Sequence, residues 1–451
     1  MKLLVTELDR RLRGSPYQGY AYAYPHKTAY RPFAEPLPLS EVWRDEGREA
    51  LFLYAHVPFC EFRCGFCNLF TQTNPQESLV ERWLATLARQ VEQTGQALGP
   101  ASFARLAVGG GTPTQLELPQ LARLFELLRS LGARPEQVPV SCEMSPDTVD
   151  PDKLALLREA GVDRASMGVQ SFLEDEARAA GRPQRTARVE QAVEWIQAAG
   201  FPLVNLDLIY GLPGQTEESW LFSLARLVEL GPSETFLYPL YVRPLTGLGK
   251  RDGADQDYVL GDPERDPRLR LYRLGREFLL ERGYEQVSMR LFRQRGQDLP
   301  PGPAYSCQQD GMVGLGVGAR SYTRALHYAS EYAVGAKGVR SIIADWVERS
   351  DAELARADYG TRLDPEEQRR RFTIQSLLHS AGLDRVAYRA RFGSDPEQDL
   401  PELTELEPRG LAAWQGEVLR LTPAGFERSD VLGPWLYSAA VNEQMAGYEL
   451  T

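Results

Sequence analysis

Three cysteines lie close together in the string HVPFCEFRCGFCNLF, with the spacing Cys60-x3-Cys64-x2-Cys67. The chain has five cysteines, and an odd number with a tight cluster favours metal binding over disulfide bonds. Thiolates hold iron–sulfur clusters, usually four of them for a 4Fe–4S cluster. Three thiolates would leave one iron open. An open iron can take the amino and carboxylate groups of S-adenosylmethionine (SAM), and an electron can then cleave its carbon–sulfur bond to give a 5′-deoxyadenosyl radical.

Zinc is the alternative metal for these cysteines. His56 precedes Cys60 by four residues, so the string holds enough ligands for a Cys3His site. His56 belongs to a predicted strand, however, and aromatic residues surround the cysteines at Phe59, Phe62 and Phe66. Because such side chains would shield a redox cluster, the sequence favours iron–sulfur over zinc.

The elements that must position this loop alternate between strand and helix from residue 51 to about 290. Strands are predicted at 51–57, 105–109, 138–143, 164–170, 202–210 and 234–242, and helices at 78–97, 119–131, 151–160, 187–199, 217–230 and 267–282. Six such units predict a parallel sheet with helices outside it. We therefore expect an α/β fold, a partial (β/α)6 barrel, with the cysteine loop at the C-terminal ends of the strands, where barrels carry their active sites.

Three regions are predicted along the chain. Residues 1–50 are rich in Tyr and Pro and are expected to form an arm, whose tyrosines either pack on the barrel or cover a pocket. Residues 51–335 form the barrel with a substrate-side extension. Residues 340–451 are expected to form a small helical, winged-helix-like domain.

Residues 310–325 predict one further strand, with Gly314, Gly316 and Gly318 at alternate positions. Alternate residues of a strand share one face, so this face carries no side chains. Either a flat ligand or a neighbouring backbone would approach it.

Polar residues recur on the inward faces of the predicted strands. In LVNLDLI, Asp207 lies on the face opposite three apolar residues, and Glu143 and Gln170 have similar places near the ends of their strands. Three polar side chains that converge at strand ends favour a ligand site.

Composition limits the partners. The formal net charge is −11, which argues against nucleic acid, and the chain has no apolar run of membrane-spanning length. The N-terminus does not read as a signal peptide, so we expect a cytoplasmic protein that acts on a small molecule.

The motif C-x3-C-x2-C with an aromatic residue before its last cysteine resembles the signature of the radical SAM superfamily. The wider string YAHVPFCEFRCGFCNLF is similar to the branch typified by oxygen-independent coproporphyrinogen III oxidase. That branch also holds a heme chaperone, radical methyltransferases and cyclopropane-forming enzymes. The resemblance runs from about residue 50 to 325 and more weakly beyond. The segments SPYQGYAYAYPHKTAYRP and AYSCQQDGMVGLGVGARSYT resemble a poorly characterised subgroup.

The resemblance implies a 4Fe–4S cluster on Cys60, Cys64 and Cys67, one or two SAM molecules, and an electron donor such as flavodoxin or ferredoxin. The glycine string 109–111 resembles the loop that contacts the amino group of SAM. By the same resemblance, the residues at the SAM site are Tyr54, Phe66, Gly110, Gly111, Thr112, Glu143, Gln170, Arg182 and Asp207.

Two residues are candidates for the substrate side, Cys307 and Arg320. Arg320 stands where the coproporphyrinogen enzyme is expected to carry an apolar residue. The heme chaperone is expected to carry His-Asn-x-x-Tyr-Trp in this region, whereas residues 305–309 read YSCQQ.

Three functions follow from the resemblance. The first is a radical SAM oxidoreductase that abstracts a substrate hydrogen, as in propionate decarboxylation on a porphyrinogen. The second is a methyl or methylene transferase that uses two SAM molecules. The third is a heme chaperone that keeps the cluster.

Overall fold

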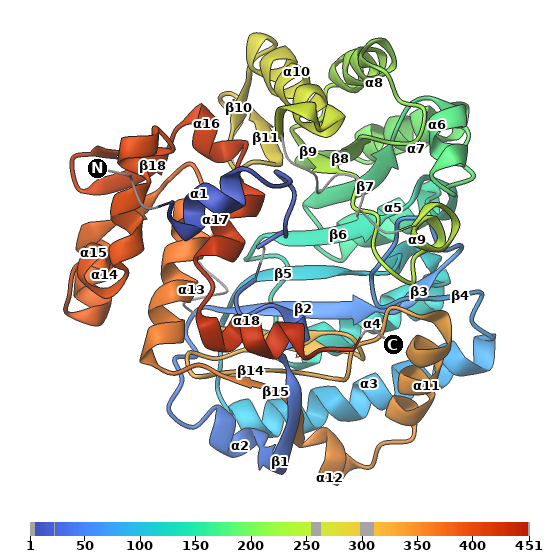
Figure 1. The fold of residues 1–451 in the computed structure, drawn as a ribbon. Coiled ribbons are helices and arrows are strands. Elements are labelled where there is room, and N and C mark those ends of the chain that lie inside the picture. Colours follow the sequence, from blue (N-terminus) through green and yellow to red (C-terminus); the bar gives the residue numbers. More distant parts are fainter. Residues whose placement is uncertain (1–4, 22, 254–262, 298–310, 450–451) are drawn as a thin grey trace.

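The computed structural model describes residues 5–21, 23–253, 263–297 and 311–449. Its main sheet contains the parallel run β2, β5, β6, β7, β8, β9, with helices outside, as Figure 1 shows. The strands are β2 (Leu51–Val57), β5 (Phe103–Gly110), β6 (Val140–Met144), β7 (Arg164–Gln170), β8 (Leu203–Tyr210) and β9 (Glu234–Pro239). The helices that follow them are α3 (Glu77–Leu98), α4 (Leu118–Ser130), α5 (Pro151–Glu159), α7 (Thr186–Ala198), α8 (Glu217–Leu230) and α10 (Pro267–Glu281). The predicted partial (β/α)6 barrel is confirmed.

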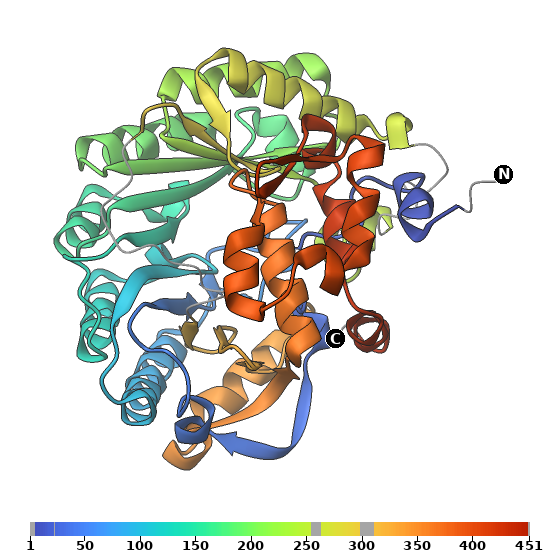
Figure 2. The same cartoon turned by 90° about the vertical axis from the view of Figure 1, so that its left-hand side faces the viewer.

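Strand alternation determines which side chains reach the lumen. In β2, Leu51, Leu53 and Ala55 are at most 1% exposed and belong to the core between sheet and helices. Phe52 and Tyr54, on the other face, are only partly buried. Figure 2, viewed along the strands, shows the sheet as an open arc with the helices outside it. The interior of this arc, here called the lumen, therefore receives side chains such as those of Phe52 and Tyr54.

The glycine-alternating segment forms a hairpin, so the prediction of one strand over 310–325 was wrong. Its strands are β12 (Met312–Leu315), which runs parallel to β2, and β13 (Arg320–Tyr322), which runs antiparallel to β12. A Cβ atom on Gly314 would lie 2.2 Å from the carbonyl oxygen of Arg320, and one on Gly316 would lie 2.5 Å from that of His56. Neighbouring backbone, the second of the two expected reasons, explains these two glycines.

Antiparallel strands extend the sheet at both edges. Beyond β13 lie β14 (Leu326–Ala329), β15 (Arg356–Arg362) and β1 (Arg31–Pro38), and beyond β9 lie β11 (Leu291–Gln294) and β10 (Tyr284–Gln286). Part of the N-terminal arm is thus a strand of the main sheet. So is β15, although it lies within the range predicted for the C-terminal domain.

The tyrosines of the arm pack against the rest of the protein. Tyr17, Tyr24 and Tyr30 are at most 4% exposed. The hydroxyl of Tyr24 donates to Glu367, and that of Tyr30 lies 3.1 Å from Nδ1 of His327. The expectation that these side chains pack is met at the described positions.

The C-terminal unit combines helices with a small sheet. Its helices include α13 (Pro365–Leu377), α14 (Arg385–Phe392), α17 (Ser429–Trp435) and α18 (Ala439–Ala446). Its strands are β16 (Leu383–Asp384), β17 (Ala412–Gln415) and β18 (Val418–Leu421), in the order β16-β18-β17. The β17–β18 hairpin beside α13 and α14 gives the predicted winged-helix-like form. The unit lies on the left of the barrel in Figure 1 and at the open side of the arc in Figure 2.

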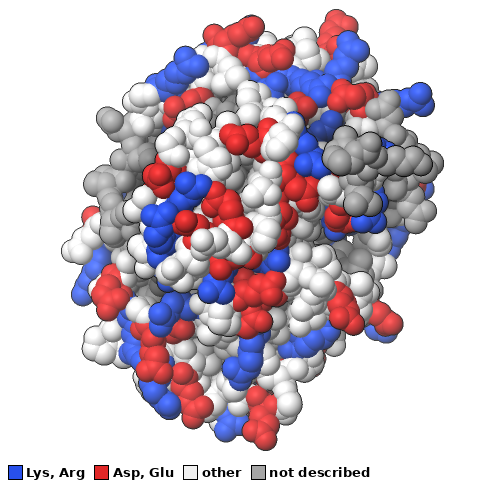
Figure 3. Space-filling model, turned by 60° about the vertical axis from the view of Figure 1, so that its left-hand side comes forward, with Lys and Arg blue, Asp and Glu red and all other residues white. Residues whose placement is uncertain are grey.

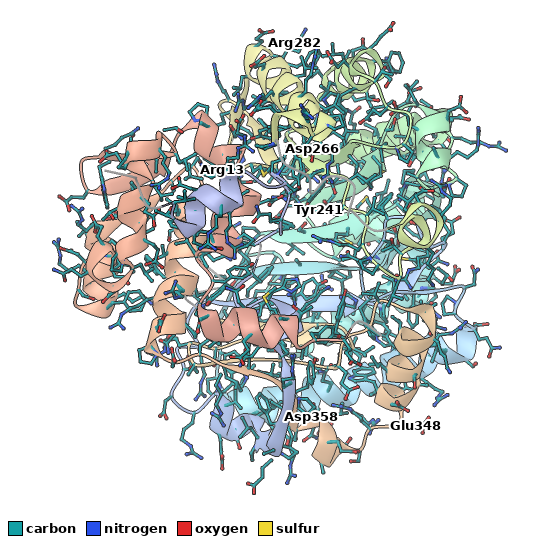
Figure 4. The ribbon with its side chains drawn as sticks, viewed as in Figure 1. Arg13, Tyr241, Asp266, Arg282, Glu348 and Asp358 are labelled. Carbon is teal, nitrogen blue, oxygen red and sulfur yellow. The ribbon has the colours of Figure 1, made fainter. Side chains whose placement is uncertain are left out.

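A buried ion pair joins this unit to the barrel. Arg290 donates to Asp430 of α17 at 2.6 Å, and both side chains are at most 4% exposed. The hydroxyl of Tyr241, just after β9, also donates to Asp430. Figure 4 shows Tyr241 and Asp266 close to the N-terminal arm at this junction.

Surface charge is mixed over the C-terminal unit. Figure 3 shows acidic and basic side chains interspersed on the face that it draws. Within the described residues, no helix is long and apolar enough to span a membrane.

Candidate active site

The cysteine loop follows β2 at the C-terminal end of the parallel strands. Cys60, Cys64 and Cys67 are free thiols with half-buried side chains. The short strands β3 (Phe59–Cys60) and β4 (Gln72–Thr73) pair with each other and close the base of the loop. The sequence therefore places all three thiols where barrels carry their chemistry.

The glycine loop after β5 is bonded directly to the cysteine loop. The backbone NH of Gly111 donates to the carbonyl of Val57 at 2.7 Å, and that of Thr112 donates to Phe59 at 2.7 Å. The hydroxyl of Thr112 donates to Sγ of Cys60 at 3.6 Å. A Cβ atom on Gly111 would lie 2.3 Å from the carbonyl oxygen of Phe59. Only glycine permits this contact between the two loops.

The two preceding glycines make room for side chains of the site. A Cβ atom on Gly109 would lie 2.7 Å from the carboxyl carbon of Glu143. Gly110 has a φ of +112°, and a Cβ there would lie 2.6 Å from the ring of His56. The NH of Gly110 donates to Oε2 of Glu143 at 3.0 Å, so the glycine loop also fixes this carboxylate.

Cys60, Cys64 and Cys67 are not arranged as a single-ion site. In the described part of the chain, no group of three His, Cys, Asp or Glu side chains is arranged to hold one metal ion. A tetrahedral zinc site would require ligand sulfurs within about 4 Å of one another. Each cysteine of a 4Fe–4S cluster binds a different iron, which requires wider spacing. Burial, with the neighbouring thiols of Cys67 and Cys64 as smaller causes, raises the pKa of Cys60 to about 12, so this sulfur needs a cationic group nearby to ionise at neutral pH.

Both ring nitrogens of His56 contact groups other than the three thiols. Its Nε2 donates to the carbonyl of Phe70 at 3.0 Å, and its Nδ1 lies 3.1 Å from the hydroxyl of Tyr54. Burial lowers the pKa of His56 to about 4, so the ring is neutral. These bonds tie the end of β2 to the far side of the cysteine loop, and they occupy the nitrogen atoms that a zinc site would need.

Glu143 and Asp207 form an acidic side of the lumen. Glu143 is open to the lumen but surrounded by the barrel wall, and burial raises its pKa to about 7. Burial also raises the pKa of Asp207 to about 6, although Asn205 opposes this by donating to its Oδ1 at 2.7 Å. Two carboxylates with raised pKa values are suited to a cationic ligand. The positioning role of Asn205 was not predicted, although it lies two residues before Asp207 on the same strand face.

Gln170 and Arg182 lie at the end of β7. Gln170 has a φ of +69°, where the β7–β8 register shifts, and its side chain folds back over Gly168. Arg182 is 7% exposed and donates to the carbonyl of Gly168 at 2.7 Å, to Gln184 at 2.8 Å and to Sγ of Cys64 at 3.4 Å. Gln184, which holds this guanidinium, was also not predicted.

The remaining predicted residues are more scattered. Tyr54 faces the lumen from β2, and Phe66 packs against an apolar cluster that includes Leu212 and Leu248. Arg320 lies in β13, two strands from Tyr54. Cys307 lies outside the described residues.

Known protein families match both the barrel and the C-terminal unit. Residues 54–227 match the radical SAM superfamily, and residues 363–427 match the HemN C-terminal domain. Oxygen-independent coproporphyrinogen III oxidase of Escherichia coli is 29% identical over 430 residues, which cover 90% of this chain and 91% of that protein. The heme chaperone HemW of Bacillus subtilis is 27% identical over 399 residues, or 86% of this chain and 99% of that protein.

A solved structure supports the same relationship. The coproporphyrinogen III oxidase HemN from Escherichia coli, described as a radical SAM enzyme, superposes with a TM-score of 0.76 and 26% identity. The match covers 92% of this chain and 96% of that one. The chain therefore contains a radical SAM domain and a HemN C-terminal domain, and it is similar over nearly its whole length to oxygen-independent coproporphyrinogen III oxidase.

Proposed function

We propose that Cys60, Cys64 and Cys67 hold the 4Fe–4S cluster that the superfamily implies. SAM would bind between the glycine loop and the ends of β6, β7 and β8. Its proposed contacts are Tyr54, Phe66, Gly110, Gly111, Thr112, Glu143, Gln170, Arg182 and Asp207. Together, cluster and SAM supply 5′-deoxyadenosyl radical chemistry, which starts with abstraction of a substrate hydrogen atom.

One arrangement carries this proposal. The glycine loop contacts Cys60 on one side, through Thr112, and the carboxylate of Glu143 on the other, through the NH of Gly110. A ligand bound to an iron at the thiols would therefore lie near the carboxylate of Glu143, which the glycine loop holds in place. This suits a ligand with an amino group near the metal and a second cationic centre close by.

The protein side chains have distinct tasks in this proposal. Glu143 and Asp207 pair with positive charge, because their raised pKa values fall when a cation is near. Arg182 balances the negative thiolate at Cys64 and stays fixed by its bond to Gln184.

For the reaction itself we propose oxidoreductase chemistry of the coproporphyrinogen III oxidase kind. The support is the Escherichia coli relative, which matches over nearly the whole of both chains. An external protein such as flavodoxin or ferredoxin would supply the electron. Leu69, two residues after Cys67, is 49% exposed, so the proposed cluster loop reaches the surface.

A heme chaperone is the second candidate, because HemW of Bacillus subtilis matches over 99% of its length. The sequence YSCQQ at 305–309 differs from the string expected of that chaperone, which favours the first candidate. Methyl or methylene transfer is a further possible outcome of the same radical.

Anaerobic reconstitution separates these functions. The enzyme should bind about four irons per chain and, with reductant and SAM, release 5′-deoxyadenosine. With coproporphyrinogen III, loss of carbon dioxide supports the oxidoreductase. Formation of S-adenosylhomocysteine with a methylated product would support transfer, and tight heme binding without 5′-deoxyadenosine would support the chaperone.

Two cysteine variants provide matched controls. Cys64→Ser should lose iron and activity together. Cys142→Ser should keep both, because Cys142 is fully buried in the core between sheet and helices. Equal iron content in the two variants would contradict the proposed cluster site.

A further inference from the structure

The sheet places Arg320 beside Tyr54 on the lumen face. Gly314 of β12 is the register partner of Tyr54 in the parallel pair β12–β2. In the antiparallel pair β12–β13, Met312 is opposite Tyr322, so Gly314 is opposite Arg320. Directly opposed residues project from the same face of a sheet. The side chains of Tyr54 and Arg320 thus share the lumen face, with a residue that has no side chain between them.

A second cation comes from the N-terminal arm. The ammonium of Lys27 lies 3.6 Å from the centroid of the Tyr332 ring. The hydroxyl of Tyr332 donates to the carbonyl of Asn68 at 2.7 Å, and Asn68 directly follows Cys67. One aromatic ring therefore connects Lys27 to the cysteine loop.

The charges around this part of the lumen are positive. Burial depresses the pKa of His26 well below its usual value, and the positive charges of Lys27, Arg320 and Arg243 lower it further. Arg320 and Lys27 act in the same way on His56 at the end of β2. Each of these cations thus lies close enough to a buried histidine to act on it, whereas the carboxylates of Glu143 and Asp207 occupy β6 and β8.

We propose that Arg320, assisted by Lys27, binds a carboxylate group of the substrate at the β13 side of the lumen and thereby determines substrate specificity. This inference rests on the proposed function and deepens it. A guanidinium offers a planar pair of donors that matches a carboxylate.

Binding of a stable probe tests the inference without turnover. Coproporphyrin III and its tetramethyl ester share one ring system but differ in charge, and their fluorescence reports binding to the reconstituted holoenzyme with SAM. The wild type should bind the acid more tightly than the ester. Arg320→Met should weaken binding of the acid about tenfold or more, since a hydrogen bond to a charged group is lost, and should leave binding of the ester unchanged.

Arg324→Met is the matched control. Arg324 lies four residues further along the chain, in the turn between β13 and β14, with an exposed side chain paired with Glu46, and this variant should bind both probes as the wild type does. Arg320→Lys should fall between wild type and Arg320→Met, because it keeps the charge but loses the paired donors. Should Arg320→Met fail to fold, Lys27→Met gives the same test with a smaller expected loss.

Two results would overturn the inference: equal binding of acid and ester by the wild type, or unchanged preference for the acid in the variants at Arg320 and Lys27. Failure of the proposed function gives a different signal. In that case the wild type releases no 5′-deoxyadenosine, whatever its preference between the probes.

Discussion

The guanidinium of Arg182 donates to the Sγ atom of Cys64 at 3.4 Å and to the carbonyl of Gly168 at 2.7 Å. It thereby joins the cysteine loop to the end of β7, where the chain turns at Gln170. Because Arg182 is 7% exposed, its charge is poorly solvated and gains from a thiolate nearby. This contact couples the proposed cluster site to the proposed SAM site.

Replacement of Arg182 should therefore affect SAM more than iron. Arg182→Gln loses the charge at Cys64 but keeps a polar side chain, so we expect near-normal iron content with SAM affinity lowered about tenfold or more. The change in the electron paramagnetic resonance spectrum of the reduced cluster on SAM addition measures this. Arg178→Gln is the control, because the side chain of Arg178 is exposed and pairs with the exposed carboxylate of Asp175. Wild-type SAM affinity in Arg182→Gln would contradict the coupling.

The glycine loop should tolerate no side chain at Gly111. In Gly111→Ala the new Cβ would meet a backbone carbonyl at 2.3 Å, and backbone cannot move aside as a flexible side chain can. We expect loss of iron binding and of 5′-deoxyadenosine formation. Gly14→Ala, whose Cβ would make an ordinary 3.4 Å contact on the arm, should behave as the wild type. The iron content and the 5′-deoxyadenosine formed by the two variants test this expectation.

Much of this site could be predicted from the sequence, because the alternation of apolar and polar residues along a strand determines which side chains face the lumen. The alternation in LVNLDLI places Asp207 in the lumen, and the strand order then brings it near Glu143. Asn205 shares that face, but nothing in the sequence shows that its amide bonds to a carboxylate and not to water. Gln184 is similar, because its bond to Arg182 depends on how the chain turns after α6 (Glu174–Ala179).

The segments at the sheet edges were harder to predict. The 310–325 segment satisfies the pattern of a strand throughout, yet Gly316 and Gly318 have φ values of +84° and +94° and turn the chain into a hairpin. The strand β1 pairs with β15, more than three hundred residues away. Such a partner leaves no trace in the local pattern of the arm.

The affinity for SAM should depend on pH through Glu143. Its pKa is raised to about 7 in the folded protein, so the carboxyl is largely neutral at lower pH and cannot pair with a cation. Binding of SAM should therefore tighten as the pH rises through about 7. Glu143→Gln should bind SAM more weakly and with a shallower pH dependence, which anaerobic calorimetry can measure. Glu126→Gln, an exposed substitution on α4, is the control. An unchanged pH profile in Glu143→Gln would refute this role.

Asn205 should act as a positioning residue for Asp207. Its side chain is 1% exposed and its Nδ2 donates both to Asp207 at 2.7 Å and to Ser166 at 2.9 Å. The first bond stabilises the ionised carboxylate and so opposes the rise in pKa that burial causes. In Asn205→Ala the pKa of Asp207 should rise further, and the pH at which SAM binding is half-maximal should move upward.

The size of that shift separates positioning from a general loss of structure. A hydrogen bond to a charged group contributes about 1.5 kcal/mol or more, which corresponds to about one pH unit. We expect the midpoint of SAM binding in Asn205→Ala to shift upward by about this amount, with iron content and limiting affinity at high pH close to wild type. Asn442→Ala, which removes only a bond to the carbonyl of Tyr437, should shift nothing. If Asn205→Ala lowered the affinity for SAM equally at every pH, the amide would stabilise the local structure without affecting the ionisation of Asp207.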